Sequence, residues 1–115
     1  MKVYGIPNCN TVKKARTWLE EHGQDYEFHD YKKQGVPEAL MKKLLKTYGH
    51  ETLINRNGPT WRKLPDDVKA SVVDAASALP VMQANSSAIK RPIVEHDGRY
   101  LFGFKEADYE EFFSK

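Results

Sequence analysis

Cysteine is almost absent from this 115-residue sequence, which contains only Cys9. A disulfide within the chain is therefore excluded, as is a zinc site built from several thiolates. A chain without disulfides is typical of reducing compartments, so a cytoplasmic location is predicted. If the one thiol takes part in redox chemistry, the thiol that resolves its product must come from another molecule.

Long hydrophobic runs and a strong charge imbalance are also missing. No stretch approaches the roughly 20 apolar residues of a membrane helix, and the apolar run at the N-terminus is too short for a signal peptide. The 18 Lys and Arg residues nearly balance the 16 Asp and Glu residues. We therefore expect neither a membrane nor a nucleic acid as partner. The 40% of hydrophobic residues suffice for one packed core, so we expect one monomeric domain over residues 1–115.

Motifs for bound cofactors are not found. The four histidines show no spacing typical of metal ligands, and neither a G-x-G-x-x-G sequence nor a Walker loop occurs. No bound metal, flavin or nucleotide is predicted. The separation of Cys9 from Arg16 is C-x6-R, in contrast to the C-x5-R of tyrosine phosphatase loops. Because position 12 is Val, the cysteine belongs to neither a C-x-x-C nor a C-x-x-S motif.

The first 31 residues have the pattern of a βαβ unit. Lys2–Ile6 is a run of β-forming residues, and the apolar positions then follow helical spacing from Asn10 to Gly23. Tyr26–Tyr31 alternates with the period of a strand. Two strands joined by a helix in this way are expected to be parallel, with a right-handed crossover.

Residues 36–89 are predicted to be helical. Pro37 suits the first turn of a helix that ends at Gly49. Leu64–Asp67 is typical of another helix start, and the Ala- and Val-rich stretch up to Ala84 is predicted to be helical with a break at Pro80. Residues 85–87 are predicted to form a loop.

The end of the chain completes the sheet. Pro92–His96 and Arg99–Phe102 are strand-like runs separated by Asp97-Gly98, a two-residue hairpin turn. Acidic residues and an aromatic stripe mark a last helix. The order predicts an α/β fold of the thioredoxin type. Its four-stranded mixed sheet comes from about residues 1–35 and 90–115, with an all-helical insertion at about 36–89.

Cys9 directly precedes the first predicted helix. The unpaired N–H groups at a helix start favour the thiolate, which is the reactive form. Lowering a thiol pKa from about 8.5 to about 6 takes about 3.4 kcal/mol, whereas a helix dipole supplies only about 0.3–2 kcal/mol. A cationic neighbour is therefore also required. The alternative is that Cys9 is a small buried hydrophobic residue.

Polar residues surround the thiol in the sequence. Asn8, Asn10 and Thr11 are assigned as substrate-binding candidates. Asn10 or Thr11 either caps the helix or donates a hydrogen bond to the sulfur, and the two roles are compatible.

Two arginines are the candidate cations. Arg91 precedes Pro92 at a strand start, where a proline is tolerated and is usually trans. In a thioredoxin-like fold, however, this proline is expected to be cis and to face the thiol. That geometry would bring Arg91 near Cys9 and leave the preceding backbone free to pair with a substrate. Arg56 lies in the helical insertion and is either a second cation for an anionic ligand or an ordinary solvated side chain.

Four segments together carry a resemblance to a known family. They are Gly5-Ile6-Pro7-Asn8-Cys9-Asn10-Thr11, Leu53-Ile54-Asn55-Arg56, Ile89-Lys90-Arg91-Pro92-Ile93-Val94 and Gly103-Phe104. With these segments in this order and at these separations, the chain resembles the arsenate reductase-like family, which also contains the Spx regulators, over essentially its whole length. It is most similar to the YffB-type members, which have one cysteine and have been proposed to be glutathione-dependent thiol reductases.

The resemblance implies a role for each matching residue. Cys9 matches the nucleophile, while Arg56 and Arg91 match two of the three arginines with which arsenate reductases hold their oxyanion. The third is expected near Gly103-Phe104 and is absent there, so poor arsenate reduction is expected. The implied activity is a thiol-disulfide reductase that uses glutathione as co-substrate and an oxidised thiol as substrate.

Two other functions are known within the same family. One is an Spx-like regulator that binds RNA polymerase. Spx-type switches generally use a C-x-x-C that closes on oxidation, and Val12 removes that switch, which leaves a monothiol regulator as the alternative. The other is a glutathione-coupled arsenate reductase.

Overall fold

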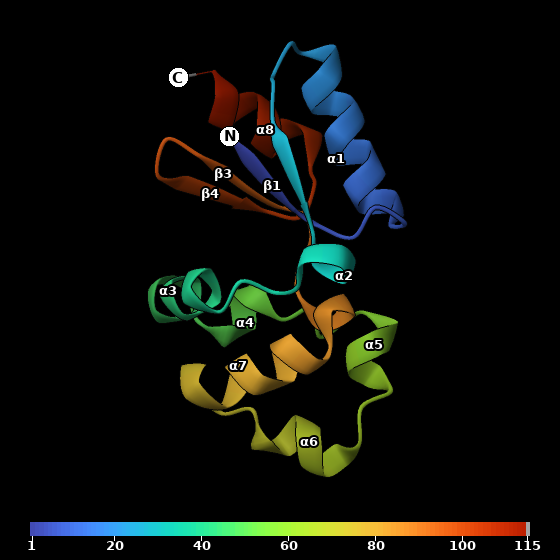
Figure 1. Ribbon diagram of the computed structural model, residues 1–115, viewed down its shortest axis with the longest axis vertical. Coiled ribbons are helices and arrows are strands. Elements are labelled where there is room, and N and C mark those ends of the chain that lie inside the picture. Colours follow the sequence, from blue (N-terminus) through green and yellow to red (C-terminus); the bar gives the residue numbers. More distant parts are fainter. Residues whose placement is uncertain (115) are drawn as a thin grey trace. The chain divides into compact units, whose positions relative to one another are not determined.

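The computed structural model describes residues Met1–Ser114, which form two compact units (Figure 1). The sheet unit contains Met1–Gln34 and the chain from Arg91 onward. The helical unit is Gly35–Lys90. In the described chain, every helix is too short or too polar to cross a membrane. The interpretation of residues 1–115 as a single domain stays a prediction.

The sheet unit contains the four predicted strands in the order β2-β1-β3-β4. β1 pairs in parallel with β2 and antiparallel with β3, and β3 and β4 form the antiparallel hairpin. Asp97 and Gly98 connect the hairpin with φ angles of 52° and 74°, as a tight two-residue turn requires. The mixed sheet is therefore confirmed. The strands are β1 (Lys2–Gly5), β2 (Glu27–Asp30), β3 (Ile93–His96) and β4 (Arg99–Phe102).

Two helices, α1 (Asn10–Glu21) and α8 (Glu106–Phe113), pack against one face of this sheet. Their contact is aromatic, since the rings of Trp18 and Tyr109 meet edge to face at 5.5 Å. Beneath them lie Val3 and Val94, which are cross-strand partners and fully buried. This packing fixes the start of α1 relative to the ends of β1 and β3.

The strand predicted over Tyr26–Tyr31 is shorter than expected. It ends at Asp30, and Tyr31 begins a short helix, α2 (Tyr31–Gln34). The carboxylate of Asp30 accepts a hydrogen bond from the Lys32 N–H at 2.8 Å, and Gln34 accepts one from the Asp30 N–H at 3.1 Å. These local bonds turn the chain out of the sheet.

The helical unit is built around α3 and α7, which pack against each other. As predicted, α3 stops at Gly49, whose positive φ of 86° is one that glycine adopts readily. A single antiparallel bridge joins Ile54 to Ile89. The helices are α3 (Glu38–Tyr48), α4 (His50–Leu53), α5 (Pro59–Arg62), α6 (Asp66–Ser71) and α7 (Ala75–Ala84), followed by the 3₁₀ turn η1 (Ser86–Ala88).

The predicted break at Pro80 is wrong, because α7 runs through this residue. The interruption lies instead between Ser71 and Ala75. There, Asp74 accepts a hydrogen bond from the Ser77 N–H at 2.9 Å, and the Ser77 hydroxyl accepts one from the Asp74 N–H at 3.0 Å. This capping box starts a new helix, which continues past Pro80 with one backbone hydrogen bond fewer. The predicted loop at residues 85–87 is partly the turn η1.

Candidate functional site

Cys9 and Arg91 meet at one edge of the sheet. β1 and β3 are antiparallel neighbours, so the carboxyl end of β1 and the amino end of β3 lie side by side. Cys9 follows the first end, and Arg91 precedes the second. Gly5 permits the close approach of Val12 in the first turn of α1, because an added Cβ at Gly5 would lie 3.1 Å from the Val12 side chain. The same Cβ would lie 3.8 Å from Cβ of Arg91, which is an ordinary contact.

The guanidinium of Arg91 contacts the thiol directly. Its Nε–H donates a hydrogen bond to Cys9 Sγ at 3.4 Å, across 82 residues of sequence. The Arg91-Pro92 peptide bond is cis, as the thioredoxin-like fold predicts. Cys9 is partly exposed, so the alternative of a buried hydrophobic cysteine is wrong. The expected cationic neighbour is therefore in place.

The surroundings of Cys9 favour its thiolate. Burial by itself raises the pKa of the thiol, but the Val12 N–H, the Arg91 guanidinium and the Thr11 N–H all lower it. Their combined effect places the pKa of Cys9 below its ordinary value. Two of these three groups belong to the helix start, and the third, Arg91, lies just before β3, which matches the requirement inferred from the sequence.

The polar neighbours of Cys9 lie at the surface. Asn8, Asn10 and Thr11 are exposed. Cys9 itself is the N-cap residue of α1, so neither Asn10 nor Thr11 caps this helix. The backbone N–H of Thr11 nevertheless lowers the pKa of the thiol. The substrate-binding roles assigned to these side chains stay predictions.

Pro92 links the thiol site to the segment where a third arginine was expected. Pro92 is fully buried, and its carbonyl accepts a hydrogen bond from the Gly103 N–H at 2.8 Å. The carbonyl of Gly103 accepts another from the Tyr109 hydroxyl at 2.8 Å. Gly103 has a φ of 80°, which is unfavourable for a residue with a side chain. This backbone therefore disfavours an arginine at the position.

Arg56 lies in the helical unit, exposed, in the turn that precedes α5. Its Nη2 lies 3.2 Å from Nδ1 of His50, and its guanidinium lies over the ring of Trp61. Cys9 and Arg91 thus lie together in the sheet unit, whereas Arg56 belongs to the helical unit.

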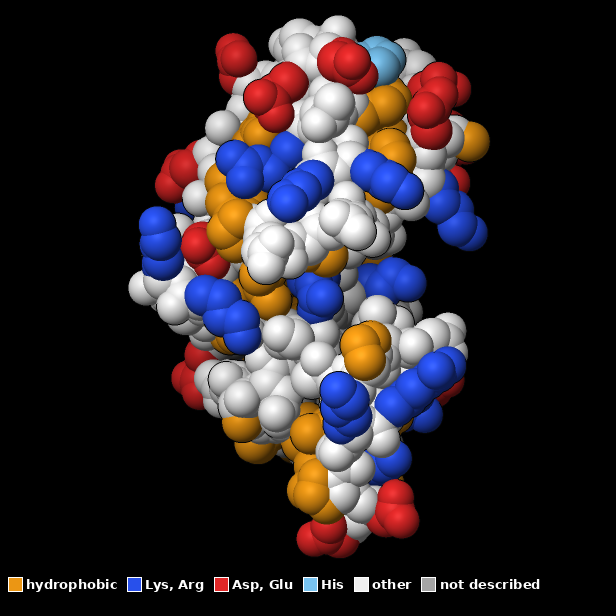
Figure 2. Space-filling view, turned by 90° about the vertical axis from the view of Figure 1, so that its right-hand side faces the viewer, with side chains coloured by type: hydrophobic (Ala, Val, Ile, Leu, Met, Phe, Trp, Pro, Cys, Tyr) orange, Lys and Arg blue, Asp and Glu red, His pale blue; other side chains and the backbone are white. Residues whose placement is uncertain are grey.

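Figure 2 shows Lys and Arg side chains spread among acidic and apolar ones.

Sequence reasoning missed one buried polar group near Arg91. The Tyr31 hydroxyl is buried and has no hydrogen-bond partner in the described part of the chain. Burial raises the pKa of Tyr31, the nearby Tyr4 raises it further, and the charge of Arg91 opposes the rise. The place of Tyr31 within a predicted strand gave no indication that its hydroxyl would be buried.

Among Met1–Ser114, no three His, Cys, Asp or Glu side chains converge as a metal site requires.

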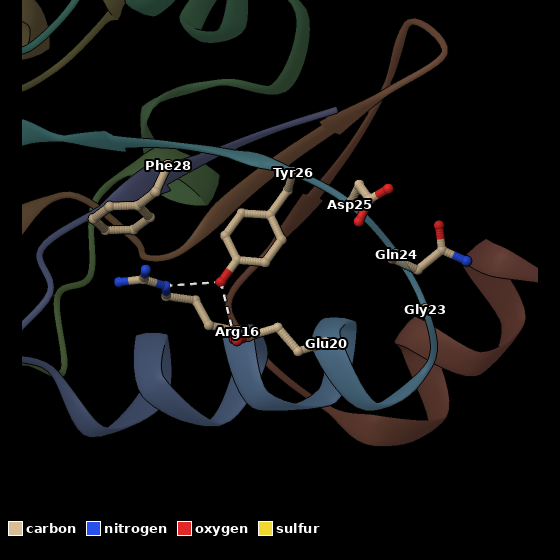
Figure 3. A pocket seen from close by; sticks show the side chains of 7 residues that line it. All are labelled: Arg16, Glu20, Gly23, Gln24, Asp25, Tyr26 and Phe28. Atoms are coloured by element: carbon tan, nitrogen blue, oxygen red, sulfur yellow. Dashed lines mark hydrogen bonds between the residues drawn. The ribbon is translucent and has the colours of Figure 1, made fainter.

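A pocket of about 470 Å³ lies between α1 and β2 in the sheet unit, away from the thiol (Figure 3). Across it, Arg16 Nε donates to the Tyr26 hydroxyl at 2.9 Å, and that hydroxyl donates to Glu20 at 3.0 Å. The guanidinium also stacks on Phe28, 4.2 Å from its ring centre. The charges of Arg16 and Glu20 are thus linked through Tyr26, which connects α1 to the residue just before β2. The lining residues are Arg16, Glu20, Gly23, Gln24, Asp25, Tyr26 and Phe28.

Replacement of Tyr26 by phenylalanine is expected to lower the free energy of unfolding by about 1 kcal/mol, because it removes two hydrogen bonds in a partly solvated place. The phenyl ring keeps the packing against Arg16. Cys9 does not line this pocket, so the thiol reactivity of Cys9 should not change. Denaturant unfolding and the alkylation rate of Cys9 measure the two effects. An unfolding free energy equal to that of the unmodified protein would show that this link adds no stability.

Comparison with known proteins extends these observations. The model of the ArsC family matches residues 4–112. An uncharacterised protein of Haemophilus influenzae is 41% identical over 112 residues, or 97% of each chain. The solved structure of a YffB protein is 45% identical, with a TM-score of 0.89 over 96% of each chain. An arsenate reductase (ArsC) related protein from Brucella melitensis is 54% identical, with a TM-score of 0.76 over 99% of this chain and 94% of that one. The resemblance and the thioredoxin-like fold predicted from the sequence are thereby confirmed.

Proposed function

Because the chain belongs to the ArsC family, we propose that it is a thiol-disulfide reductase with Cys9 as nucleophile and glutathione as co-substrate. The observation that carries this proposal is the 3.4 Å contact between Arg91 Nε and Cys9 Sγ at the start of α1. A thiol that is partly exposed, and whose pKa is lowered by a cation and a helix start, is equipped for nucleophilic attack.

The reaction proceeds by two kinds of thiol exchange. The Cys9 thiolate attacks one sulfur of an oxidised substrate disulfide, forms a mixed disulfide and releases the other sulfur as a thiolate that takes up a proton. A glutathione thiolate then attacks the mixed disulfide and regenerates the Cys9 thiolate. A second glutathione releases the remaining substrate thiol and leaves as glutathione disulfide, so two glutathiones reduce one disulfide. External resolution follows from the single cysteine.

The other assigned residues bind the substrate. Glutathione carries two carboxylates, and arginine pairs with a carboxylate through two parallel N–H bonds. Arg56 and Arg91 bind these carboxylates. The exposed side chains of Asn8, Asn10 and Thr11 contact the oxidised substrate, and the backbone before Pro92 pairs with it. No resident metal or organic cofactor takes part in this proposal.

The protein is expected to form a one-to-one mixed disulfide with glutathione and to reduce arsenate poorly or not at all. Arsenate is an oxyanion that gains charge during thiolate attack, so it needs every cation that faces it. The position expected for the third arginine is Gly103, whose φ of 80° disfavours any side chain. Losing one charge-assisted contact costs about 1.5–3 kcal/mol, or one to two decades of affinity.

Two measurements test this choice of substrate. Mass spectrometry after incubation with oxidised glutathione detects the adduct on Cys9, and glutathione-coupled turnover is compared for a small disulfide and for arsenate. Efficient arsenate turnover without a glutathione adduct would restore the arsenate reductase assignment. If neither substrate turns over and the protein instead captures RNA polymerase subunits in a pull-down, the Spx-like regulator is the better assignment.

A further inference from the structure

His50 and Trp61, two residues of the helical unit, contact the guanidinium of Arg56 from two sides. On one side, Nη2 of Arg56 lies 3.2 Å from Nδ1 of His50, at the start of α4. On the other, the guanidinium carbon lies 5.4 Å from the ring centre of Trp61, on α5. Trp61 is 8% exposed, so its ring is fixed by burial. An arginine side chain that is exposed and otherwise free to rotate is thereby restrained at two points.

The backbone on both sides of Arg56 is anchored as well. Ile54 pairs with Ile89, and both side chains are buried. The Asn55 N–H donates to the Ala88 carbonyl at 2.8 Å. The turn then closes through a 3.3 Å bond from the Gly58 N–H to the Asn55 carbonyl. These bonds fix the position from which the Arg56 side chain extends.

From this geometry we propose that His50 and Trp61 are positioning residues, which orient the Arg56 guanidinium to bind a carboxylate of glutathione. The proposal rests on the function proposed above. Because arginine only donates hydrogen bonds, Nδ1 of His50 is the acceptor, and this bond uses one of five guanidinium N–H groups. The other donors can face a carboxylate. An arginine oriented in advance loses less conformational freedom when the ligand binds.

Replacing His50 by alanine is expected to raise the KM for glutathione about three- to tenfold, which is the range for one net hydrogen bond. The kcat should stay within about twofold, because the proposed role of His50 is to orient Arg56 and not to take part in thiol exchange. His50→Asn is expected to restore the KM, since its Oδ1 lies where Nδ1 lay and accepts the same bond. His50→Asp should again raise the KM, because a carboxylate beside Arg56 neutralises the charge that the ligand needs.

A double-mutant cycle separates positioning from a general structural role. In the Arg56→Ala background, His50→Ala should cause no further rise in KM, because the side chain that it positions is gone. Trp61→Phe keeps an aromatic face beneath the guanidinium and should have a small effect, whereas Trp61→Leu should raise the KM. Thermal melting of each variant identifies any that does not fold, and NMR relaxation of Arg56 Nε reports directly whether the side chain is ordered.

The results distinguish the failure of this inference from the failure of the proposed function. If the unmodified protein shows neither a glutathione adduct nor glutathione-dependent turnover, the proposed function fails and takes this inference with it. If turnover is normal but His50→Ala leaves the KM unchanged, the inference alone is overturned. It is also overturned if the rise in KM persists in the Arg56→Ala background, or if Arg56 Nε is disordered in the unmodified protein.

Discussion

Replacement of Cys9 by serine is expected to abolish disulfide reduction completely while the protein remains folded. Serine has nearly the same shape as cysteine, but its hydroxyl hardly ionises at neutral pH, so no nucleophile remains. Cys9 is the only thiol in the chain, and no second cysteine can replace it. Glutathione-coupled turnover and mass spectrometry with oxidised glutathione measure the loss.

The serine variant also provides its own folding control. Cys9 occupies the position preceding α1 and makes no side-chain capping hydrogen bond. Serine is among the preferred residues there, because its oxygen accepts a bond from the first turn. The melting temperature should therefore be unchanged or slightly higher. Turnover that survives in a folded Cys9→Ser protein would show that the reaction does not pass through this residue.

The position of Cys9 at a helix start was predictable because its determinants are local. A strand, a short loop and a helical period place the cysteine at a helix start, and the sheet order then brings Arg91 beside it. The place of Cys9 needs only the sequence near one strand end. The contact with Arg91 spans 82 residues, and its prediction needed the whole fold, because it came from the cis-proline geometry expected of a thioredoxin-like domain.

The features that were missed depend on side-chain hydrogen bonds and on burial. The break before α7 follows from an Asp74–Ser77 capping box, which lacks the Glu or Gln usual at its fourth position. The end of β2 follows from the Asp30 carboxylate. The cluster of His50, Arg56 and Trp61 joins two short helices across a turn. The sequence spacing of these three residues therefore matches neither a helix nor a strand period.

Replacement of Arg91 by alanine is expected to slow alkylation of Cys9 at neutral pH on the order of tenfold. Arg91 stabilises the thiolate through a hydrogen bond and through its charge, and its loss raises the thiol pKa toward the ordinary value. A hydrogen bond to a charged group contributes about 1.5–3 kcal/mol. The lower end applies because Cys9 is partly exposed and water screens the charge. An uncharged alkylating agent is used, so that binding of glutathione does not enter the rate.

The pH dependence of the alkylation rate tests this prediction further. In the unmodified protein, alkylation should remain fast below the ordinary thiol pKa and slow only as the pH falls through the lowered one. In Arg91→Ala the same decline should occur at higher pH, because the thiolate has lost its cation. At alkaline pH both proteins carry the thiolate, and their rates should converge. Arg91→Lys keeps the charge but not the directed Nε–H, so its profile should lie between the two. Coincident profiles for all three proteins would mean that the helix start alone activates Cys9, and that Arg91 does not set the reactivity of the thiol.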